Sequence, residues 1–149
     1  MDEFAYDSPI GPLTLRLREG VITWVGFEGA EGPALPPGHP VREWLDTFFA
    51  GTPPPELPLA LDVTPFQRAV LEATSGIPRG EVRTYVWVAA RVGRPRGARA
   101  VGQALGANPI PLVIPCHRVV GSGWRGGYGG GLHRKEFLLA LERSRSPGG

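Results

Sequence analysis

The chain of 149 residues contains a single cysteine, Cys116, and a single lysine, Lys135. One cysteine cannot form an intramolecular disulfide, and it excludes a metal site built from several cysteines. Long hydrophobic runs are also missing, because no stretch approaches the ~20 consecutive apolar residues of a membrane-spanning helix. The acidic beginning, Met1-Asp2-Glu3, lacks the basic region of a secretory signal. We therefore expect a cytoplasmic protein without a metal site or a membrane contact.

Acidic residues are absent from one long stretch. Residues 82–135 contain nine basic and no acidic residues, whereas residues 1–81 contain 12 acidic and 5 basic residues. The formal net charge of +2 thus combines an acidic first half with a basic second half. A basic stretch without interspersed acids is typical of a surface that binds a polyanion, although a solvated basic face is an alternative.

Glycine and proline are abundant, with 22 and 17 residues, a level at which disorder has to be considered. The hydrophobic content of 42% and the four tryptophans argue for a folded chain that is rich in turns. A chain of this length forms one compact domain, or two small lobes that share a core.

The first part of the chain has the pattern of a small α/β lobe. Alternating leucines predict a strand, a turn at Glu19-Gly20 makes it a hairpin with residues 21–27, and residues 4–6 form a strand before it. Helical spacing of apolar residues then predicts an amphipathic helix that ends at Gly51. The leucines and the helical residues are Leu13, Leu15 and Leu17, and Val41, Trp44, Leu45, Phe48 and Phe49. Four prolines in residues 52–58 predict an extended linker.

The rest of the chain reads as mainly helical. Thr64 and Gln67 form a capping box for a helix that stops at Ser75-Gly76. Short helices at 85–92 and 98–107, with a glycine-containing turn between them, are consistent with a helix-turn-helix. The apolar residues 112–114 predict a buried strand or core segment. A last helix covers 132–142, and its expected inward residues are Phe137, Leu138 and Leu141.

The predicted fold is therefore α/β, of the α+β kind, with two lobes. Residues 1–61 form a small lobe with an antiparallel sheet and a helix. Residues 62–149 form a mainly helical lobe that carries a helix-turn-helix DNA-binding motif.

Small residues gather at two places. The helix at 98–107 contains Gly102 and Gly106, and each glycine costs a helix about 1 kcal/mol. A close approach to another surface would favour them, and that surface is either another helix or a nucleic-acid groove. Residues 121–131 include seven glycines, which suggests a loop whose backbone approaches a ligand.

Cys116 is either a small buried apolar residue or a reactive one. A reactive cysteine needs a base or positive surroundings, and His117 and Arg118 follow it directly. Neighbouring side chains of an extended strand point to opposite sides, so His117 reaches the thiol only through a bend or a bridging water. Glu136 and Glu142 are the carboxylates that could orient the imidazole.

The string Pro115-Cys116-His117-Arg118-Val119-Val120 resembles the active-site motif of the O6-alkylguanine-DNA alkyltransferases, also called methylated-DNA–protein-cysteine methyltransferases. The resemblance continues in order over residues 62–142. Its further strings are Thr64-Pro65-Phe66-Gln67, Ile77-Pro78-Arg79-Gly80-Glu81-Val82, Thr84-Tyr85, Ala98-Arg99-Ala100-Val101-Gly102, Asn108-Pro109, Gly127-Tyr128-Gly129-Gly130 and Lys135 to Glu142.

The resemblance implies a single-turnover transfer of an alkyl (methyl) group from O6-alkylguanine in double-stranded DNA to Cys116. In the family, His117 would draw the thiol proton through water and Glu142 would orient the imidazole. Glu136 lies six residues earlier, on another face of the helix, and cannot share this role. The resemblance implies no cofactor and no metal, and we expect a monomer.

The resemblance also implies how DNA is held. The helix at 98–107 would enter the minor groove, Arg99 would fill the gap left by a flipped guanine, and Tyr85 would lie beside the lesion phosphate and donate to the leaving guanine. Asn108 would be the hinge between this helix and the active-site segment. The other expected DNA contacts are Arg94, Arg96, Ala98, Ala100, Gly102 and Arg118.

The guanine pocket would be formed by Val119, Tyr128, Gly129 and Lys135, and the carbonyls of Cys116 and Val119 would accept from the guanine amino group. Gly129 stands where some members have serine, so a hydroxyl contact is lost and the backbone N–H remains. The zinc site of some animal members is absent.

Two alternatives from other classes stay open at this point. One is a non-catalytic lesion sensor or regulator that binds alkylated DNA and signals to a partner. The other is a cysteine hydrolase, although such a substrate gives no reason for the basic stretch.

Overall fold

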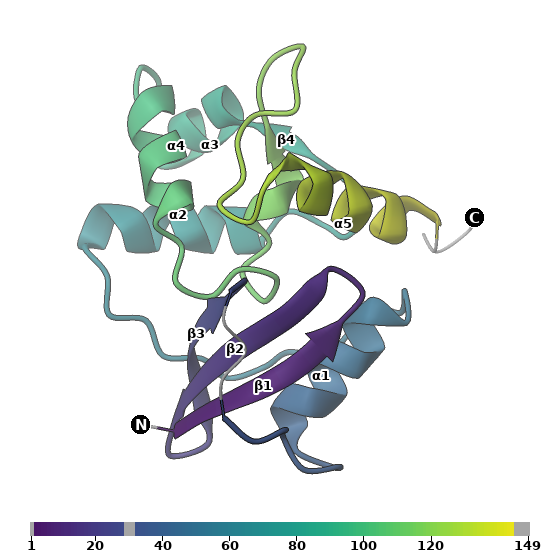
Figure 1. Ribbon diagram of the computed structural model, residues 1–149. Coiled ribbons are helices and arrows are strands. Elements are labelled where there is room, and N and C mark those ends of the chain that lie inside the picture. The colour runs from purple at the N-terminus through teal and green to yellow at the C-terminus, as the bar shows by residue number, and fades with distance from the viewer. Residues whose placement is uncertain (1, 29–31, 145–149) are drawn as a thin grey trace.

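The computed structural model describes residues 2–28 and 32–144, which form two lobes stacked on one another (Figure 1). One lobe is a three-stranded sheet with a helix, and the other is mainly helical. The buried hydrophobic residues of both lobes belong to one cluster. The two lobes therefore share a core, as one of the sequence interpretations proposed.

The sheet of the first lobe is antiparallel, with β1 (Asp2–Ser8), β2 (Gly11–Arg18) and β3 (Val21–Gly26) in this order. The turn between β2 and β3 has positive φ angles at Glu19 (52°) and Gly20 (79°), as in the two-residue turns whose twist matches a hairpin. The three alternating leucines of β2 are buried. The predicted hairpin and the strand before it are confirmed.

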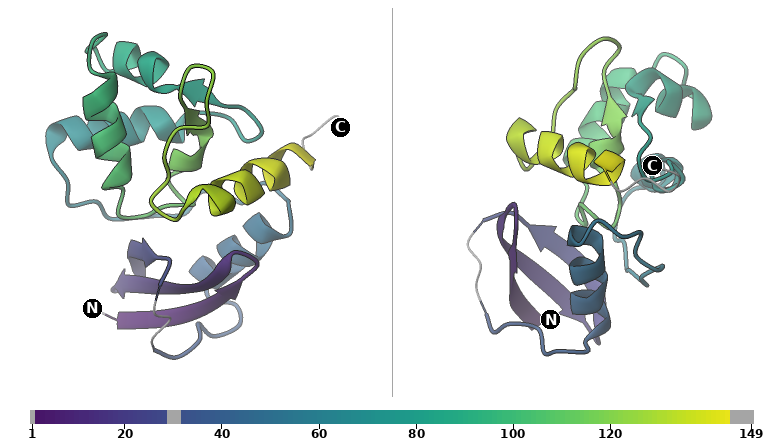
Figure 2. Two further views of the ribbon diagram at one scale, coloured as in Figure 1. Left: turned by 45° about the horizontal axis from the view of Figure 1, so that its top comes forward. Right: turned by 90° about the vertical axis from the view of Figure 1, so that its right-hand side faces the viewer.

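Helix α1 (Pro40–Phe49) covers one face of this sheet (Figure 2). It begins at His39, whose side chain accepts a hydrogen bond from the Val41 N–H. Its apolar stripe buries Trp44, Leu45 and Phe48, whereas Phe49 is half-buried and stacks on Tyr6. The predicted amphipathic helix is thus confirmed, and it ends at Phe49, two residues before the predicted end at Gly51.

The proline-rich connection runs extended and then follows the sheet edge. Ala60 N donates to Ile22 O over 3.1 Å, and Leu59 forms a parallel bridge with Ile22. Further bonds join the lobes, from Val25 N to Pro109 O (2.9 Å) and from the Arg134 Nε to Ile10 O (2.8 Å). These bonds to backbone carbonyls fix how the sheet lobe meets the helical lobe.

The helical lobe opens with α2 (Pro65–Ser75), which has the predicted capping box of Thr64 and Gln67. Helices α3 (Tyr85–Arg91) and α4 (Ala98–Gly106) follow and pack on α2 and on each other. They lie at the end of the molecule remote from the sheet (Figure 1). This arrangement matches the predicted helix-turn-helix.

Two very short strands align the active-site segment. β4 (Arg83–Thr84) pairs in parallel with β5 (Val119–Val120), and the short 3-10 helix η1 (Cys116–Arg118) lies directly before β5. Residues 112–114 are a core segment and not a strand, because Leu112 adopts φ +76° in a turn. The pairing sets Tyr85, the residue after β4, beside the loop that follows β5.

Helix α5 (Leu132–Ser144) runs along the junction of the lobes. Leu138 and Leu139 are its buried apolar residues, and Leu141 is half-buried. The prediction that Phe137 points inward is wrong, because its side chain is 41% exposed. The helix uses its inward positions for Lys135 and Glu142, which are both buried.

Candidate active site and nucleic-acid interface

Cys116 lies at the first position of η1, where the chain bends between the core segment and β5. Only 8% of the residue is exposed. It lines a pocket of about 210 Å³ together with Tyr85, Gly102, Gly127 and Tyr128. It also lines an adjoining pocket of about 370 Å³ that extends toward β3. The thiol is therefore the floor of a cavity and not core filler.

The resting thiol is protonated. Burial raises the pKa of Cys116, and Asn108 and Lys135 oppose this effect only in part. A thiol in this state needs a base before it can act as a nucleophile. The positive surroundings alone do not supply the activation.

His117 is the neighbouring base, and it is fully buried. Its Nε2 lies 3.0 Å from the Glu142 Oε1. Burial lowers the pKa of His117 and Glu142 opposes this effect, so the imidazole is neutral at pH 7 and able to take a proton. Nδ1 of the same ring has no hydrogen-bond partner in the described chain.

The Glu142 carboxylate also accepts hydrogen bonds from the guanidinium of Arg118. Arg118 donates through Nε to Oε1 (3.0 Å) and through Nη2 to Oε2 (2.6 Å), and its Nη1 bonds the Ile77 carbonyl at 2.8 Å. Burial would raise the pKa of Glu142, but the contacts with His117 and Arg118 outweigh it and lower the pKa to about 2. The carboxylate is therefore charged at neutral pH.

This geometry corrects one sequence prediction. Arg118 was expected to contact DNA, but its guanidinium is bonded inside the protein and its side chain is only 11% exposed. A side chain whose donors already hold Glu142 and a carbonyl cannot also reach a phosphate. Arg118 is a partner of the Glu142 carboxylate.

Arg79 and Phe48 complete the surroundings of this carboxylate, and sequence reasoning gave neither a role. The Arg79 Nη1 lies 3.7 Å from the Glu142 Oε2, and its guanidinium sits 5.4 Å from the centre of the Phe48 ring. Phe48 in turn meets the His117 ring edge-on at 6.3 Å. The first lobe therefore touches the imidazole through one aromatic residue of α1.

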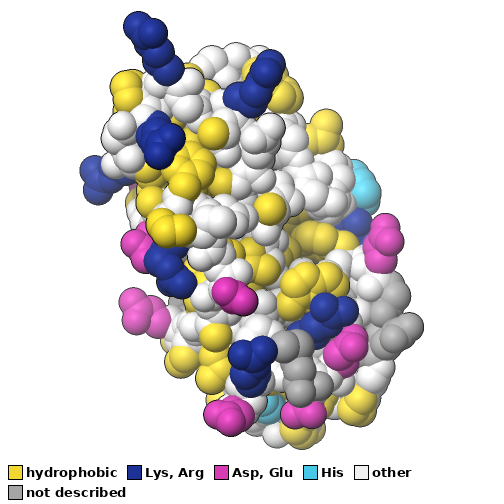
Figure 3. Space-filling view, turned by 90° about the vertical axis from the view of Figure 1, so that its left-hand side faces the viewer, with side chains coloured by type: hydrophobic (Ala, Val, Ile, Leu, Met, Phe, Trp, Pro, Cys, Tyr) yellow, Lys and Arg dark blue, Asp and Glu magenta, His cyan; other side chains and the backbone are white. Residues whose placement is uncertain are grey.

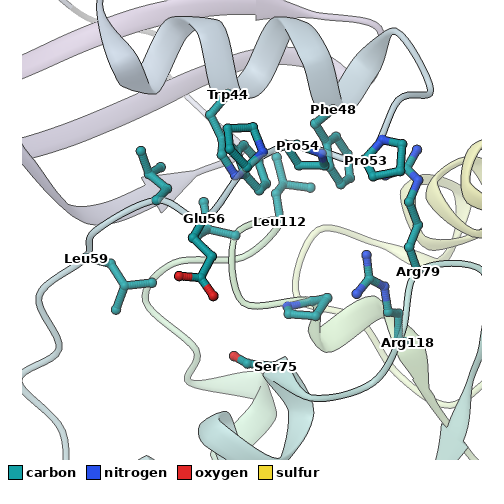
Figure 4. Close-up of a pocket in the computed structure, with 14 residues that line it drawn as sticks. Trp44, Phe48, Pro53, Pro54, Glu56, Leu59, Ser75, Arg79, Leu112 and Arg118 are labelled. Carbon is teal, nitrogen blue, oxygen red and sulfur yellow. The ribbon is translucent and has the colours of Figure 1, made fainter.

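A cavity of about 400 Å³ lies behind this group, between α1, the proline-rich connection and the helical lobe. Trp44 and Phe48 point into it from α1, and Arg79 and Arg118 reach toward it from the opposite lobe (Figure 4). The nitrogens of Arg79 are shielded from solvent. The cavity therefore lies next to Arg79 and Arg118 but does not expose the Arg79 guanidinium to solvent.

Asn108 joins the end of α4 to the active-site segment. Its Nδ2 donates to the Ile114 carbonyl (3.1 Å), and its Oδ1 accepts from the Ile110 N–H (3.0 Å). The amide thereby fixes the turn that leads to Cys116. Asn108 thus lies between α4 and the active-site segment, the position at which the family resemblance implies a hinge.

Tyr85 is held against the glycine-rich loop. Its hydroxyl accepts a hydrogen bond from the Gly127 N–H at 3.0 Å. A Cβ on Gly126, which has φ +79°, would lie 2.5 Å from this hydroxyl. Glycine is required at 126 both for the backbone angle and for the close approach. The Tyr85 O–H remains able to donate into the pocket of Cys116.

The four predicted pocket residues divide into two pairs. Tyr128 and Gly129 line both cavities at Cys116, and the Tyr128 hydroxyl has no hydrogen-bond partner in the described residues. Lys135 and Val119 lie behind the wall and line neither cavity. The buried Lys135 Nζ donates to the carbonyls of Val119 (2.6 Å) and Gly127 (2.9 Å). It supports the loop and is not a wall of the pocket.

The outer face of α4 is open. Nothing lies within 4 Å of a Cβ added to Gly106, and one added to Gly102 would meet only Tyr85 at an ordinary 3.9 Å. Gly106 therefore faces open space, and Gly102 meets Tyr85, at the start of α3, only at an ordinary van der Waals distance, so neither glycine is required for close packing within the described chain. Arg99 is exposed on the same helix and lines a hollow of about 650 Å³ with Ala98 and Gly102.

Exposed basic side chains surround this face. Arg94, whose guanidinium lies over the Phe66 ring, is exposed, as are Arg96 and Ala100. In Figure 3 the upper end of the surface, over α3 and α4, shows basic side chains and no acidic ones, whereas acidic and basic side chains are mixed lower down. The end of the molecule that carries the helix-turn-helix is thus basic on this face.

Trp124 was not singled out from the sequence, yet its side chain is 63% exposed at the rim of the same hollow. A pattern of alternating glycines gives no signal for which side of a loop an aromatic residue will face. No cluster of three metal-ligating side chains occurs in residues 2–28 and 32–144, and none of their helices is long and apolar enough to span a membrane.

The fold and the site define a class of protein: one with a single buried cysteine beside an imidazole–carboxylate pair, reached from a helix-turn-helix with a basic face. Residues 65–144 match the family model described as 6-O-methylguanine DNA methyltransferase, DNA binding domain. The chain belongs to this family of methyltransferases.

Relatives along nearly the whole chain carry a matching name. The methylated-DNA–protein-cysteine methyltransferase of Mycobacterium tuberculosis is 43% identical over 159 residues, which cover 95% of this chain and 92% of the relative. That of Salmonella typhimurium is 52% identical over 156 residues, with 91% of each chain covered. The crystal structure of Mycobacterium tuberculosis OGT in complex with DNA is similar with a TM-score of 0.87 and 42% identity, over 97% of this chain and 94% of that one.

Proposed function

We propose that this protein repairs DNA by direct reversal, taking an alkyl group, typically methyl, from O6-alkylguanine onto Cys116 in a single turnover. One observation carries the proposal. The thiol forms the floor of a pocket shared with α4 and the glycine-rich loop, and it has the His117–Glu142 pair directly behind it. Membership of the methyltransferase family supports the same reaction.

The reaction is a displacement at the alkyl carbon. The bond from the Cys116 Sγ to this carbon forms, the bond from the carbon to O6 breaks, and its electron pair stays on the guanine. One proton passes in total from the thiol to the guanine, and His117 carries it away from sulfur. The thioether that remains is stable, so each molecule reacts once.

The roles of the inner residues follow from their contacts. His117, neutral at rest, draws the thiol proton through a water, and the charged Glu142 stabilises the imidazolium that forms. Arg118 keeps Glu142 charged and in place. Lys135 holds the Val119 and Gly127 carbonyls and favours the thiolate by its charge.

The outer residues would hold double-stranded DNA by its minor groove. The small side of α4 approaches the groove, and Arg99 fills the gap left by the flipped nucleotide, which costs a few kcal/mol of stacking. Arg94 and Arg96 lie near the phosphates. We propose Tyr85 as the residue that crowds the lesion phosphate and donates to the departing guanine.

The flipped guanine would occupy the pocket against Tyr128 and Gly129. The Gly129 N–H and the carbonyls of Cys116 and Val119 are the proposed partners of the base. Because Val119 already accepts from Lys135, its carbonyl would share its two lone pairs between the ammonium and the guanine amino group. Action as a monomer in the cytoplasm, and a division of the chain after residue 61, belong to the same proposal.

Incubation with a duplex that contains one O6-methylguanine, followed by mass spectrometry of the digested protein, tests the proposal. We expect one added methyl group on the peptide that contains Cys116, at no more than one per molecule. Cys116→Ala abolishes transfer but still binds the duplex. Binding without added mass on the wild-type peptide would instead indicate a lesion sensor, and repeated turnover on an ester would indicate a hydrolase.

A further inference from the structure

Trp124 occupies a position that is built into the loop. The backbone N–H of Trp124 donates a hydrogen bond to the Gly121 carbonyl (3.4 Å). The two residues form an isolated antiparallel bridge, with Gly123 at φ +78° between them. A Cβ on Gly121 would come within 2.4 Å of three indole atoms. The indole therefore lies directly over the backbone of Gly121, and only glycine leaves room for it.

The inner side of the indole also faces Tyr85. The two ring centroids are 6.5 Å apart with an interplanar angle of 35°. The side chain is 63% exposed, and no other large hydrophobic side chain of the described residues has as large an exposed fraction. Trp124 therefore presents an aromatic surface to solvent that is held from behind by Gly121 and Tyr85.

The exposed surface borders the route to Cys116. The hollow of about 650 Å³ at Trp124 shares Tyr85, Gly102 and Gly127 with the pocket of about 210 Å³ at Cys116. Arg99 of α4 lines the same hollow. A nucleotide entering the small pocket would therefore leave its chain neighbours between the α4 side and the loop side of the hollow.

We propose that Trp124 is a stacking platform for the nucleobase next to the target guanine on the same strand. This inference rests on the proposed function and adds a residue that holds the damaged strand itself. Every nucleobase has a π-face, so stacking on an indole requires no particular sequence. Arg99 and Trp124 then have different roles. Arg99 fills the gap that the flipped guanine leaves in the duplex, and Trp124 stacks on the neighbouring base of the damaged strand.

This division predicts different substrate dependence for the two residues. Trp124→Ala weakens binding of both single-stranded and duplex oligonucleotides with O6-methylguanine about 5- to 100-fold, the range of one base–aromatic stack. Arg99→Ala weakens the duplex reaction only. Because free O6-benzylguanine has no neighbouring nucleotide, Trp124→Ala is expected to lose far more affinity for the oligonucleotides than rate with that small substrate.

Three companion variants make the test specific. Trp124→Phe keeps a ring and recovers most of the affinity, whereas Trp124→Leu keeps apolar surface without a π-system and does not. Trp87→Ala removes another exposed tryptophan, one flanked by Arg83 and Arg91 outside the hollow, and leaves strand affinity within 2-fold. Intrinsic fluorescence supplies a second readout, because DNA quenches the wild type more than Trp124→Phe.

Unchanged single-strand affinity of Trp124→Ala, or equal affinity of the Leu and Phe variants, overturns the platform. These results leave the proposed function intact as long as the wild type still transfers the methyl group to Cys116. Loss of transfer in the wild type itself would instead remove the proposed function. Thermal unfolding of each variant shows that an altered affinity does not come from an altered fold.

Discussion

The two sides of Cys116 are built on opposite principles. Behind it lie Glu142, Arg118, His117 and Lys135, all at least largely buried and joined by short contacts. In front of it the exposed residues of α4 and of the loop make few contacts with the rest of the chain. The charged groups behind Cys116 have their partners within the protein, whereas the side chains in front of it are exposed and can contact a ligand.

This difference indicates that the residues behind Cys116 determine the stability of the fold, whereas the residues in front of it serve ligand binding. Buried charges are costly unless each has its partners, so loss of one inner residue leaves the others uncompensated. Exposed arginines and small residues contribute little to folding, so the outer side can be shaped for DNA alone. The following predictions test this separation, from the largest expected effect to the smallest.

Glu142→Gln has the largest expected effect, because it removes the charge that compensates Arg118. Breaking a buried pair costs about 3–5 kcal/mol of unfolding free energy, measured by urea denaturation. The rate of transfer from free O6-benzylguanine also falls, since the imidazolium loses its partner. Glu136→Gln on the same helix, where the exposed carboxylate pairs with Arg125, costs less than about 1 kcal/mol. Similar losses in both variants would contradict the comparison.

The same carboxylate predicts an acid-sensitive stability. The pKa of Glu142 is about 2 in the folded protein, against an ordinary 4.5. Its stabilising contribution is therefore complete above pH 4.5 and is lost as the pH falls toward 2. The shift corresponds to roughly 3 kcal/mol. Unfolding free energies at pH 6 and pH 3 should differ less in Glu142→Gln than in the wild type, and an equal acid loss in both would refute the assignment.

Gly126→Ala tests the junction between the two sides. Alanine is strained at φ +79°, and its Cβ would collide with the Tyr85 hydroxyl, so we expect a cost of about 1–3 kcal/mol. Displacement of Tyr85 should also slow methyl transfer from duplex DNA. Gly127→Ala is the matched control, because nothing lies within 4 Å of its Cβ and the N–H that bonds Tyr85 remains. A comparable effect in the control would argue against the role of Tyr85.

Phe48→Leu tests the contact of the first lobe with His117 and has the smallest expected effect. Leucine keeps most of the core volume, so the stability loss is about 1 kcal/mol. The ring edge beside His117 and the ring beneath Arg79 are lost. We expect a change of a few fold in the transfer rate from free O6-benzylguanine and a shifted pH profile. Phe49→Leu, with its ring stacked on Tyr6, leaves the pH profile unchanged.

Local signals in the sequence were sufficient for most elements of the fold. The alternation of leucines in β2 and the capping box at Thr64 depend on neighbours close in sequence, and both predictions are confirmed. Phe137 was misassigned because helical spacing defines a stripe but not which of two adjacent stripes meets the core. The inward positions of α5 are occupied instead by Lys135 and Glu142, whose partners lie elsewhere in the chain.

The reactive residues of the site could be predicted from the sequence, but the contacts that surround them could not. Cys116, His117 and Glu142 were identified through the family resemblance, and the structure brings the last two into contact. The inner role of Arg118 depends on α5 lying against η1, which no local pattern reveals. Arg79 and Phe48 reach the site across the lobe junction, and Trp124 depends on how one glycine turn is folded.

The burial of the only lysine has a consequence for the charge of the DNA-facing side. Lys135 is fully buried behind the pocket wall, so every lysine-directed modification, such as acetylation, lacks a target on the outer surface. The positive groups there are guanidinium groups, which keep their protons throughout the physiological pH range. Neither acylation of amines nor moderate alkalinity can therefore lower the charge that this face presents to a phosphate backbone.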